Sequence, residues 1–129
     1  MSHFTRVKTV IRDHVLLQDT LRQLHYRFQA GEQVTIRGYQ GNTEHGQVVV
    51  DTGSQYDIGF QRQADESFAV CADWWGVRTN SALKEESFLQ QVNQTYAHLA
   101  MLGVALIATN RHLLAGLESV VQLAQRVLQ

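Results

Sequence analysis

The stretch from Ser87 to Asn110 contains no Lys, Arg, Asp or Glu, and this absence limits the possible folds of the chain more than any other feature. Phe88, Val92 and Tyr96 follow one another at helical spacing, which predicts a helix with one apolar stripe. A helix surrounded by solvent normally carries charged residues on its exposed side. We therefore expect this helix to be buried, either in its own domain or against a partner chain.

A further amphipathic helix is predicted for residues 111–129, after a break around Thr109-Asn110. The longest apolar run, Leu99–Ala108, has about half the length that a membrane span requires, so we expect no integral membrane segment. The sequence leaves open whether the two helices belong to the core or pair with another subunit. The stripe of the last helix consists of Leu113, Leu117, Val120 or Val121, Ala124 and Val127.

The N-terminal part of the chain predicts a strand followed by a helix. Apolar and polar residues alternate over residues 3–11, as in a strand that buries one face. Asp13 stands where a helix N-cap belongs, because its carboxylate can accept from free N–H groups of the first turn. Leu17, Leu21 and Leu24 then form one apolar stripe.

Four further strands are predicted in the middle of the chain, separated by segments rich in turn-forming residues. Close turns favour antiparallel neighbours joined as a meander. We therefore expect one α+β domain, residues 1–129, in which two C-terminal helices pack on one face of the sheet. Asn80 or Ser81 is the expected cap of the first of these helices. The four strands are Gln33–Arg37, Gln47–Asp51, Tyr56–Gln61 and Phe68–Trp75.

Charge and cysteine content exclude several classes of protein. Eleven Lys and Arg against twelve Asp and Glu give a formal charge of -1, so no basic excess favours nucleic-acid binding. The single cysteine, Cys71, cannot form an internal disulfide, and a small buried apolar role suits it better than that of a nucleophile. The six histidines never stand four residues apart, as zinc ligands on one helix do, and we expect no metal and no cofactor. The N-terminus lacks a signal-peptide core, so a cytoplasmic location is expected.

Several strings of residues occur together in a recognisable order: Met1-Ser2-His3-Phe4-Thr5, Arg37-Gly38-Tyr39, Tyr56-Asp57-Ile58-Gly59-Phe60 and Ala72-Asp73-Trp74-Trp75-Gly76-Val77. The chain thereby resembles an uncharacterised hypothetical chloroplast reading-frame family of cyanobacteria, plastid genomes and some phages. The resemblance implies a small soluble protein of a photosynthetic organism, in the cytoplasm or the plastid stroma, with no assigned activity or cofactor. The segment Ala105–Gln129 departs from the family pattern, which makes a subunit contact there more expected.

The string Asp73-Trp74-Trp75 is the first candidate binding site. If it continues a strand, Trp74 faces the core, whereas Trp75 and Asp73 share the opposite face. An exposed Trp beside a carboxylate is a common anchor for a partner, because it buries a large rigid surface. The alternative is that both indoles are packed in the core.

A second candidate is a polar sheet face formed by Arg37, Asp57 and Asp73. Two carboxylates and a guanidinium could line a pocket for a small ligand or for acid–base chemistry, whereas the simpler interpretation is an Arg–Asp salt bridge. Tyr39 and Trp75, together with Arg37, could also stack on RNA bases, but the net charge argues against it.

Taken together, the patterns favour a non-catalytic accessory protein that docks on a protein partner. The expected contact is the Trp75 side of the sheet or the C-terminal helices, through which the chain could also form a homo-oligomer. We assign no catalytic residue. A small-ligand protein or enzyme that uses Arg37, Asp57 and Asp73 is the alternative hypothesis.

Overall fold

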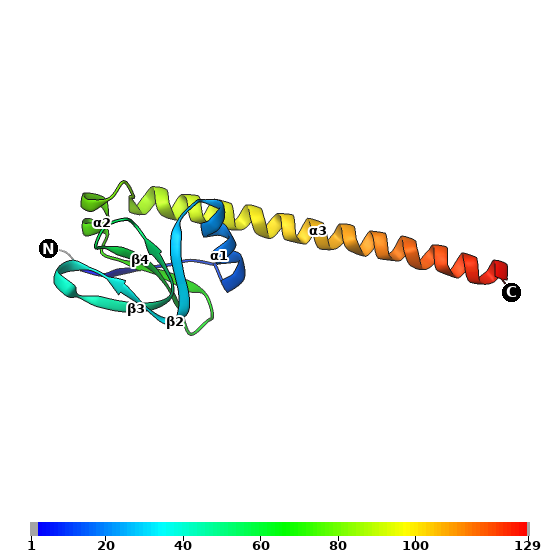
Figure 1. The fold of residues 1–129 in the computed structure, drawn as a ribbon, viewed down its shortest axis with the longest axis horizontal. Coiled ribbons are helices and arrows are strands. Elements are labelled where there is room, and N and C mark those ends of the chain that lie inside the picture. The colour runs from blue at the N-terminus through cyan, green and yellow to red at the C-terminus, as the bar shows by residue number, and fades with distance from the viewer. Residues whose placement is uncertain (1–2, 129) are drawn as a thin grey trace. The chain divides into compact units, whose positions relative to one another are not determined.

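The computed structural model describes residues 3–128, and within its last helix the side chains of residues 85–111, 115, 116, 122 and 125–127. The chain forms two compact units, Met1–Tyr96 and Ala97–Gln129, called the N-terminal unit and the C-terminal unit below. The strands, shown in Figure 1, are β1 (Thr5–Lys8), β2 (Arg27–Arg37), β3 (Thr43–Asp51), β4 (Asp57–Arg62) and β5 (Phe68–Ala72). The helices are α1 (His14–Gln23), α2 (Trp74–Asn80) and α3 (Glu85–Leu128), with a 3-10 turn, η1, at Tyr39–Gly41.

The five strands form one antiparallel sheet in the order β1-β5-β4-β3-β2. Strands β2 to β5 are therefore the predicted meander, and β1 adds to its far edge, with Val7 opposite Val70. The predicted α+β class is confirmed.

One face of the sheet carries the main core, and the helices supply its other side. Strands β3, β4 and β5 contribute alternate residues, as a half-buried sheet requires, while α1, α2 and the first turns of α3 cover them. The cluster includes Leu17, Leu21, Val48, Val50, Ile58, Phe60, Phe68, Val70, Val77, Phe88 and Val92.

The first helix follows its sequence prediction closely. The Asp13 carboxylate accepts a hydrogen bond of 2.9 Å from the backbone N–H of Leu16, so it caps α1 as expected. Leu17 and Leu21 are fully buried, and Leu24 packs against the same core. Local signals were sufficient here because the cap and the stripe lie within one segment.

The second face of the sheet is covered by the β2–β3 hairpin itself, which arches over it. Ile36 forms a small cluster there with Val49 and Cys71, and it lies so close to Gly59 that an added Cβ would stand 2.1 Å from its Cδ1. The register of β2 against β3 shifts between Ala30 and Val34, and such bulges bend a strand. We call the residues 34–37 and 43–46 of this hairpin the arch.

The last predicted strand is too long, and the helix that follows it was missed. Strand β5 ends at Ala72, and Asp73 caps α2 by accepting from the N–H of Gly76 at 3.2 Å. Trp74 and Trp75 therefore lie on a helix instead of a strand. Ser81 ends α2 instead of starting a helix, and α3 begins at Glu85.

Strands β2 and β3, by contrast, are longer than predicted. Strand β2 starts at Arg27 and β3 at Thr43, both earlier than predicted. Gly31, a residue typical of turns, lies inside β2 at the bulge, where the strand bends without ending.

Helix α3 has no break at Thr109-Asn110. It runs without interruption from Glu85 to Leu128, and the Thr109 hydroxyl donates to the carbonyl of Ala105 at 3.0 Å, which lets a polar residue sit within the helix. Glu85 and Glu86 occupy its first turn, as expected for the positive end of the helix dipole. The side chains of Leu113, Leu117, Val120, Val121 and Ala124 lie outside the described residues.

Candidate functional site

Arg37 and Asp57 form a well-defined ion pair on the second face of the sheet. The guanidinium donates from Nε to Oδ2 at 2.8 Å and from a terminal nitrogen to Oδ1 at 2.9 Å, the two-pronged geometry that is strongest for this pair. The backbone N–H of Arg37 also donates to Oδ2 at 2.9 Å. The hydrogen bonds from the guanidinium to the Asp57 carboxylate raise the pKa of Arg37. The arch makes the contact possible, because it brings the end of β2 over the start of β4.

A groove of about 420 Å³ lies beside this ion pair. Its walls come from β2, β3 and β4, and its charged groups balance in sign: two guanidinium groups and two carboxylates. Since Arg37 and Asp57 already satisfy each other, little of their charge is available to a ligand. The lining residues are Arg27, Phe28, Gln29, Thr35, Arg37, Val49, Asp51 and Asp57.

Asp73 does not join this groove. Asp57 and Asp73 stand at the same end of β4 and β5, next to the paired residues Ile58 and Ala72. Asp73, however, is 1% exposed and caps α2, and it lines a different hollow together with Tyr39. The structure thus brings together Arg37 with Asp57, and Asp73 with Tyr39, but it forms no single pocket with both carboxylates.

The two tryptophans have different environments on α2. Trp74 is 8% exposed and its ring packs 5.9 Å from that of Phe88, while its indole Nε1 has no hydrogen-bond partner among the described residues. Trp75 is 48% exposed. The sequence left open whether Trp75 is exposed or both indoles are packed in the core. In the structure Trp75 faces outward because the helix that Asp73 starts points neighbouring residues in different directions.

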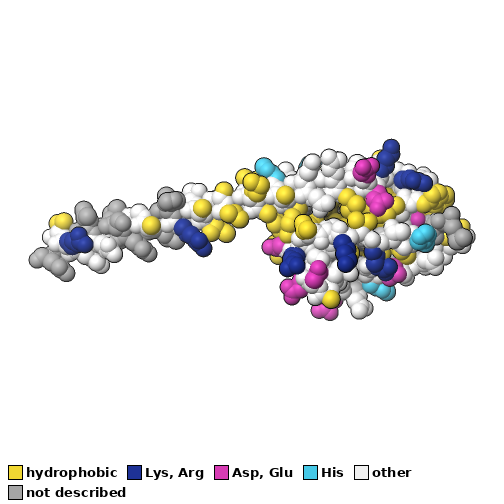
Figure 2. Space-filling model, turned by 180° about the vertical axis from the view of Figure 1, so that it is seen from behind, with side chains coloured by type: hydrophobic (Ala, Val, Ile, Leu, Met, Phe, Trp, Pro, Cys, Tyr) yellow, Lys and Arg dark blue, Asp and Glu magenta, His cyan; other side chains and the backbone are white. Residues whose placement is uncertain are grey.

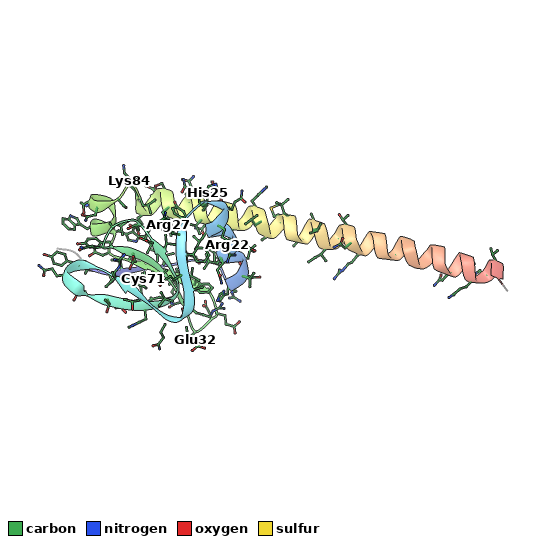
Figure 3. The ribbon with its side chains drawn as sticks, in the orientation of Figure 1. Arg22, His25, Arg27, Glu32, Cys71 and Lys84 are labelled. Atoms are coloured by element: carbon green, nitrogen blue, oxygen red, sulfur yellow. The ribbon has the colours of Figure 1, made fainter. Side chains whose placement is uncertain are left out.

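Cys71, labelled in Figure 3, lies on β5 beside the edge strand β1 and is fully buried. Burial, the largest cause, raises the pKa of its thiol to about 11, and a thiol that stays protonated is a poor nucleophile. Among the described residues, no three His, Cys, Asp or Glu side chains gather as a metal site would require.

The C-terminal unit presents the largest run of exposed apolar side chains in the described part of the chain. Five of the seven residues from Met101 to Ile107 are large, apolar and at least 52% exposed. Figure 2 shows such side chains on the surface of α3. The lack of charge identified this segment in the sequence, but the predicted stripe ended at Leu102 or Gly103, so of the five exposed residues it included at most Leu102. No helix of the described residues has both the length and the apolar character to cross a membrane.

Comparison with known proteins identifies a family. The sequence model of DUF1257, described as a protein of unknown function, matches residues 20–107. The chain belongs to the DUF1257 family. This confirms the resemblance seen in the sequence strings, and the family match ends within α3, so that residues 108–129 lie beyond it.

Two relatives of similar length support the assignment. The uncharacterized protein ycf35 of Guillardia theta is 30% identical over 111 residues, which cover 81% of this chain and 79% of the relative. The uncharacterized protein ycf35 of Cyanophora paradoxa is 31% identical over 104 residues, covering 79% and 77%. No solved structure gives a significant match.

Proposed function

We propose that this DUF1257 protein is a non-catalytic binding protein that docks on protein through the apolar residues of its C-terminal unit. The observation that carries the proposal is the exposed run from Met101 to Ile107 within a stretch that has no charged residue between Ser87 and Asn110. Contiguous exposed apolar surface on a folded protein typically marks an interaction site, because contact with water is unfavourable there.

Trp75 gives the N-terminal unit a candidate contact of its own. The indole is about half exposed, and the first turn of α2 is fixed by the Asp73 cap, so the ring is held on a rigid element. Rigid, partly exposed tryptophans are common energetic centres of protein interfaces. We assign Trp75 a supporting role, because it is a single residue, whereas the C-terminal unit presents a continuous surface.

The alternative function, a small-ligand site or enzyme at Arg37, Asp57 and Asp73, has weaker support. The carboxylates of Asp57 and Asp73 line separate hollows, and Asp57 is engaged by Arg37. Paired carboxylates need a shared site to divide acid and base roles between them.

For location, we propose the cytoplasm, or the plastid stroma if the protein is encoded there. The support is the similarity to the ycf35 proteins of Guillardia theta and Cyanophora paradoxa.

Affinity capture with quantitative mass spectrometry tests the docking proposal. The tagged full chain, a Met101→Gln/Ile107→Gln double variant and Trp75→Ala are compared as baits in extract of the native organism, and their complexes are sized by light scattering. We expect the double variant to lose any bound protein, including further copies of the chain, and Trp75→Ala to retain most of it. If the double variant keeps everything that the wild type binds, the docking proposal is wrong.

A further inference from the structure

Helix α3 contains a seven-residue apolar repeat in the C-terminal unit. Starting at Leu99, the next stripe positions follow at alternating steps of four and three residues, without a slip, over the unbroken helix. A step average of 3.5 residues is the signature of helices that wind around one another. In heptad letters the d positions are Leu99, Leu106, Leu113, Val120 and Val127, and the a positions are Gly103, Asn110, Leu117 and Ala124.

The same repeat already packs against protein in the N-terminal unit. Val92 and Tyr96 hold the preceding d and a positions; Val92 is 1% exposed and Tyr96 packs against the main core. From Met101 to Arg111 every residue is exposed. The stripe is thus packed against the core at Val92 and Tyr96 and exposed from Met101 to Arg111. Only the exposed part needs a binding partner.

Asn110 indicates what that partner is. It is the one polar residue among the a and d positions of residues 99–127. A polar residue in an apolar seam is costly unless it meets a partner, and Asn at an a position meets its own copy when two chains run parallel in register. An amide both donates and accepts, so two such side chains satisfy each other. An antiparallel pair over the same segment would place Asn110 against apolar positions.

Charge placement agrees with self-association. Between residues 97 and 128 the sequence has only three charged residues, Arg111, Glu118 and Arg126. In the same heptad register they fall at b, b and c, outside the seam and its flanking e and g positions. Identical helices can therefore pair without bringing like charges together, which otherwise decides against homotypic pairing.

We infer that residues 99–127 associate in parallel and in register with the same segment of a second copy of this chain, with Asn110 opposite Asn110. The inference rests on the proposed docking function and names its partner. The flanking e positions, among them Ile107, are apolar as well, so that the apolar face is wide enough to take additional copies in the same register.

The first test is the mass of the purified full-length protein by light scattering with analytical ultracentrifugation. We expect two or more whole multiples of 14.6 kDa. Leu106→Glu places a charge at a d position and should reduce the mass to that of one chain. Ala108→Glu is the control: it introduces the same charge two residues away at an f position that is also exposed and lies outside the run from Met101 to Ile107, and it should leave the assembly intact. Tryptophan fluorescence verifies that both variants keep the N-terminal unit folded.

The second test fixes direction and register. In a Cys71→Ala background, Gly103→Cys puts a thiol at an a position and Met101→Cys puts one at an exposed f position. In a glutathione redox buffer, the parallel arrangement should link Gly103→Cys chains into covalent dimers at least ten times faster than Met101→Cys chains.

The outcomes separate this inference from the docking proposal. A mass of one chain at all concentrations, equal loss of assembly in Leu106→Glu and Ala108→Glu, or equal cross-linking at the two positions overturns self-association. If the chain is a monomer and yet loses a different bound protein in the Met101→Gln/Ile107→Gln variant, docking stands and only the second copy is excluded. A monomer that binds nothing in either form overturns both.

Discussion

The two units differ in the exposure of the same kinds of side chain. In the N-terminal unit, leucines, valines and phenylalanines of α1, α3 and the sheet are fully buried in one cluster, whereas in the C-terminal unit Met101, Val104 and Ile107 are more than half exposed. Both sets occur on α3 itself. Periodicity therefore determines which side of a helix is apolar, but only a neighbouring element determines whether that side is buried. An apolar helix without such an element needs a partner from another chain.

Shortening one side chain in each part of α3 to alanine should give the largest difference in unfolding free energy. Phe88→Ala removes a ring that packs on Tyr26, Phe60 and Trp74 at centroid distances of 5.4, 6.3 and 5.9 Å, and we expect the N-terminal unit to lose about 3–5 kcal/mol of unfolding free energy. Leu102→Ala should leave that value within about 0.5 kcal/mol. Urea unfolding followed by tryptophan fluorescence measures both, and equal losses would contradict the division into two units.

Removal of the ion pair between Arg37 of the arch and Asp57 of β4 should have the next largest effect on the unfolding free energy. Arg37→Ala leaves the carboxylate of Asp57, which is 5% exposed, without its main partner, and we expect a loss of about 1–3 kcal/mol. The control is Arg22→Ala, which breaks the exposed pair with Asp19 and should cost less than about 0.5 kcal/mol. If the two variants are equally stable in urea, the arch does not depend on this pair.

Two glycine substitutions should change stability in opposite directions. Gly59→Ala forces Ile36 away from the sheet and should destabilise the N-terminal unit by about 1 kcal/mol or more. Gly103→Ala meets no atom within 4 Å and should stabilise α3 by about 1 kcal/mol through helix propensity. Thermal melts read by circular dichroism, with fluorescence as a separate probe of the N-terminal unit, measure both. Stabilisation by Gly59→Ala would show that the arch is loosely packed.

The smallest expected effect is a pH dependence of the N-terminal unit. Asp65 accepts from the hydroxyl and backbone N–H of Ser67 at 2.6 and 3.0 Å, and these bonds, the hydroxyl first, lower the pKa of Asp65. A lowered pKa means that the stabilisation is present above the unfolded value of about 3.9 and is lost as the pH falls through the folded value. The melting temperatures of wild type and Asp65→Asn should therefore differ slightly at pH 7 and converge at lower pH. A constant difference would exclude ionisation as the cause.

Features that depend on a few neighbouring residues could be predicted from the sequence. The Asp13 cap and the Leu17 and Leu21 stripe belong to one segment, and the alternation of Ile58 with Phe60 identifies the core face of β4. Trp74 and Trp75 were placed on a strand because alternation from Phe68 continues through them. Asp73 carries the contrary signal, since an Asp can start a helix at the end of a strand.

Features that depend on distant residues could not be predicted. The bulge of β2 bends the hairpin over the sheet and brings Arg37 to Asp57, twenty residues further along the chain, and no local pattern contains that bend. The Arg–Asp salt bridge offered as the simpler interpretation does form, between Arg37 and Asp57, but Asp73 lines a separate hollow and no pocket holds both carboxylates. The exposed run beyond residue 100 was recognised by its lack of charge, but its exposure depends on what surrounds the helix.

The buried position of Cys71 allows local opening of the N-terminal unit to be measured by the reactivity of its thiol. Cys71 is fully buried in the cluster with Ile36 of the arch, Val49 and Phe4, so an alkylating reagent reaches it only when this cluster opens or the unit unfolds. Its rate of modification in native buffer, divided by that of the unfolded chain, is then the fraction of molecules open at any moment. The one natural cysteine thus allows the open fraction of the N-terminal unit to be measured without a substitution.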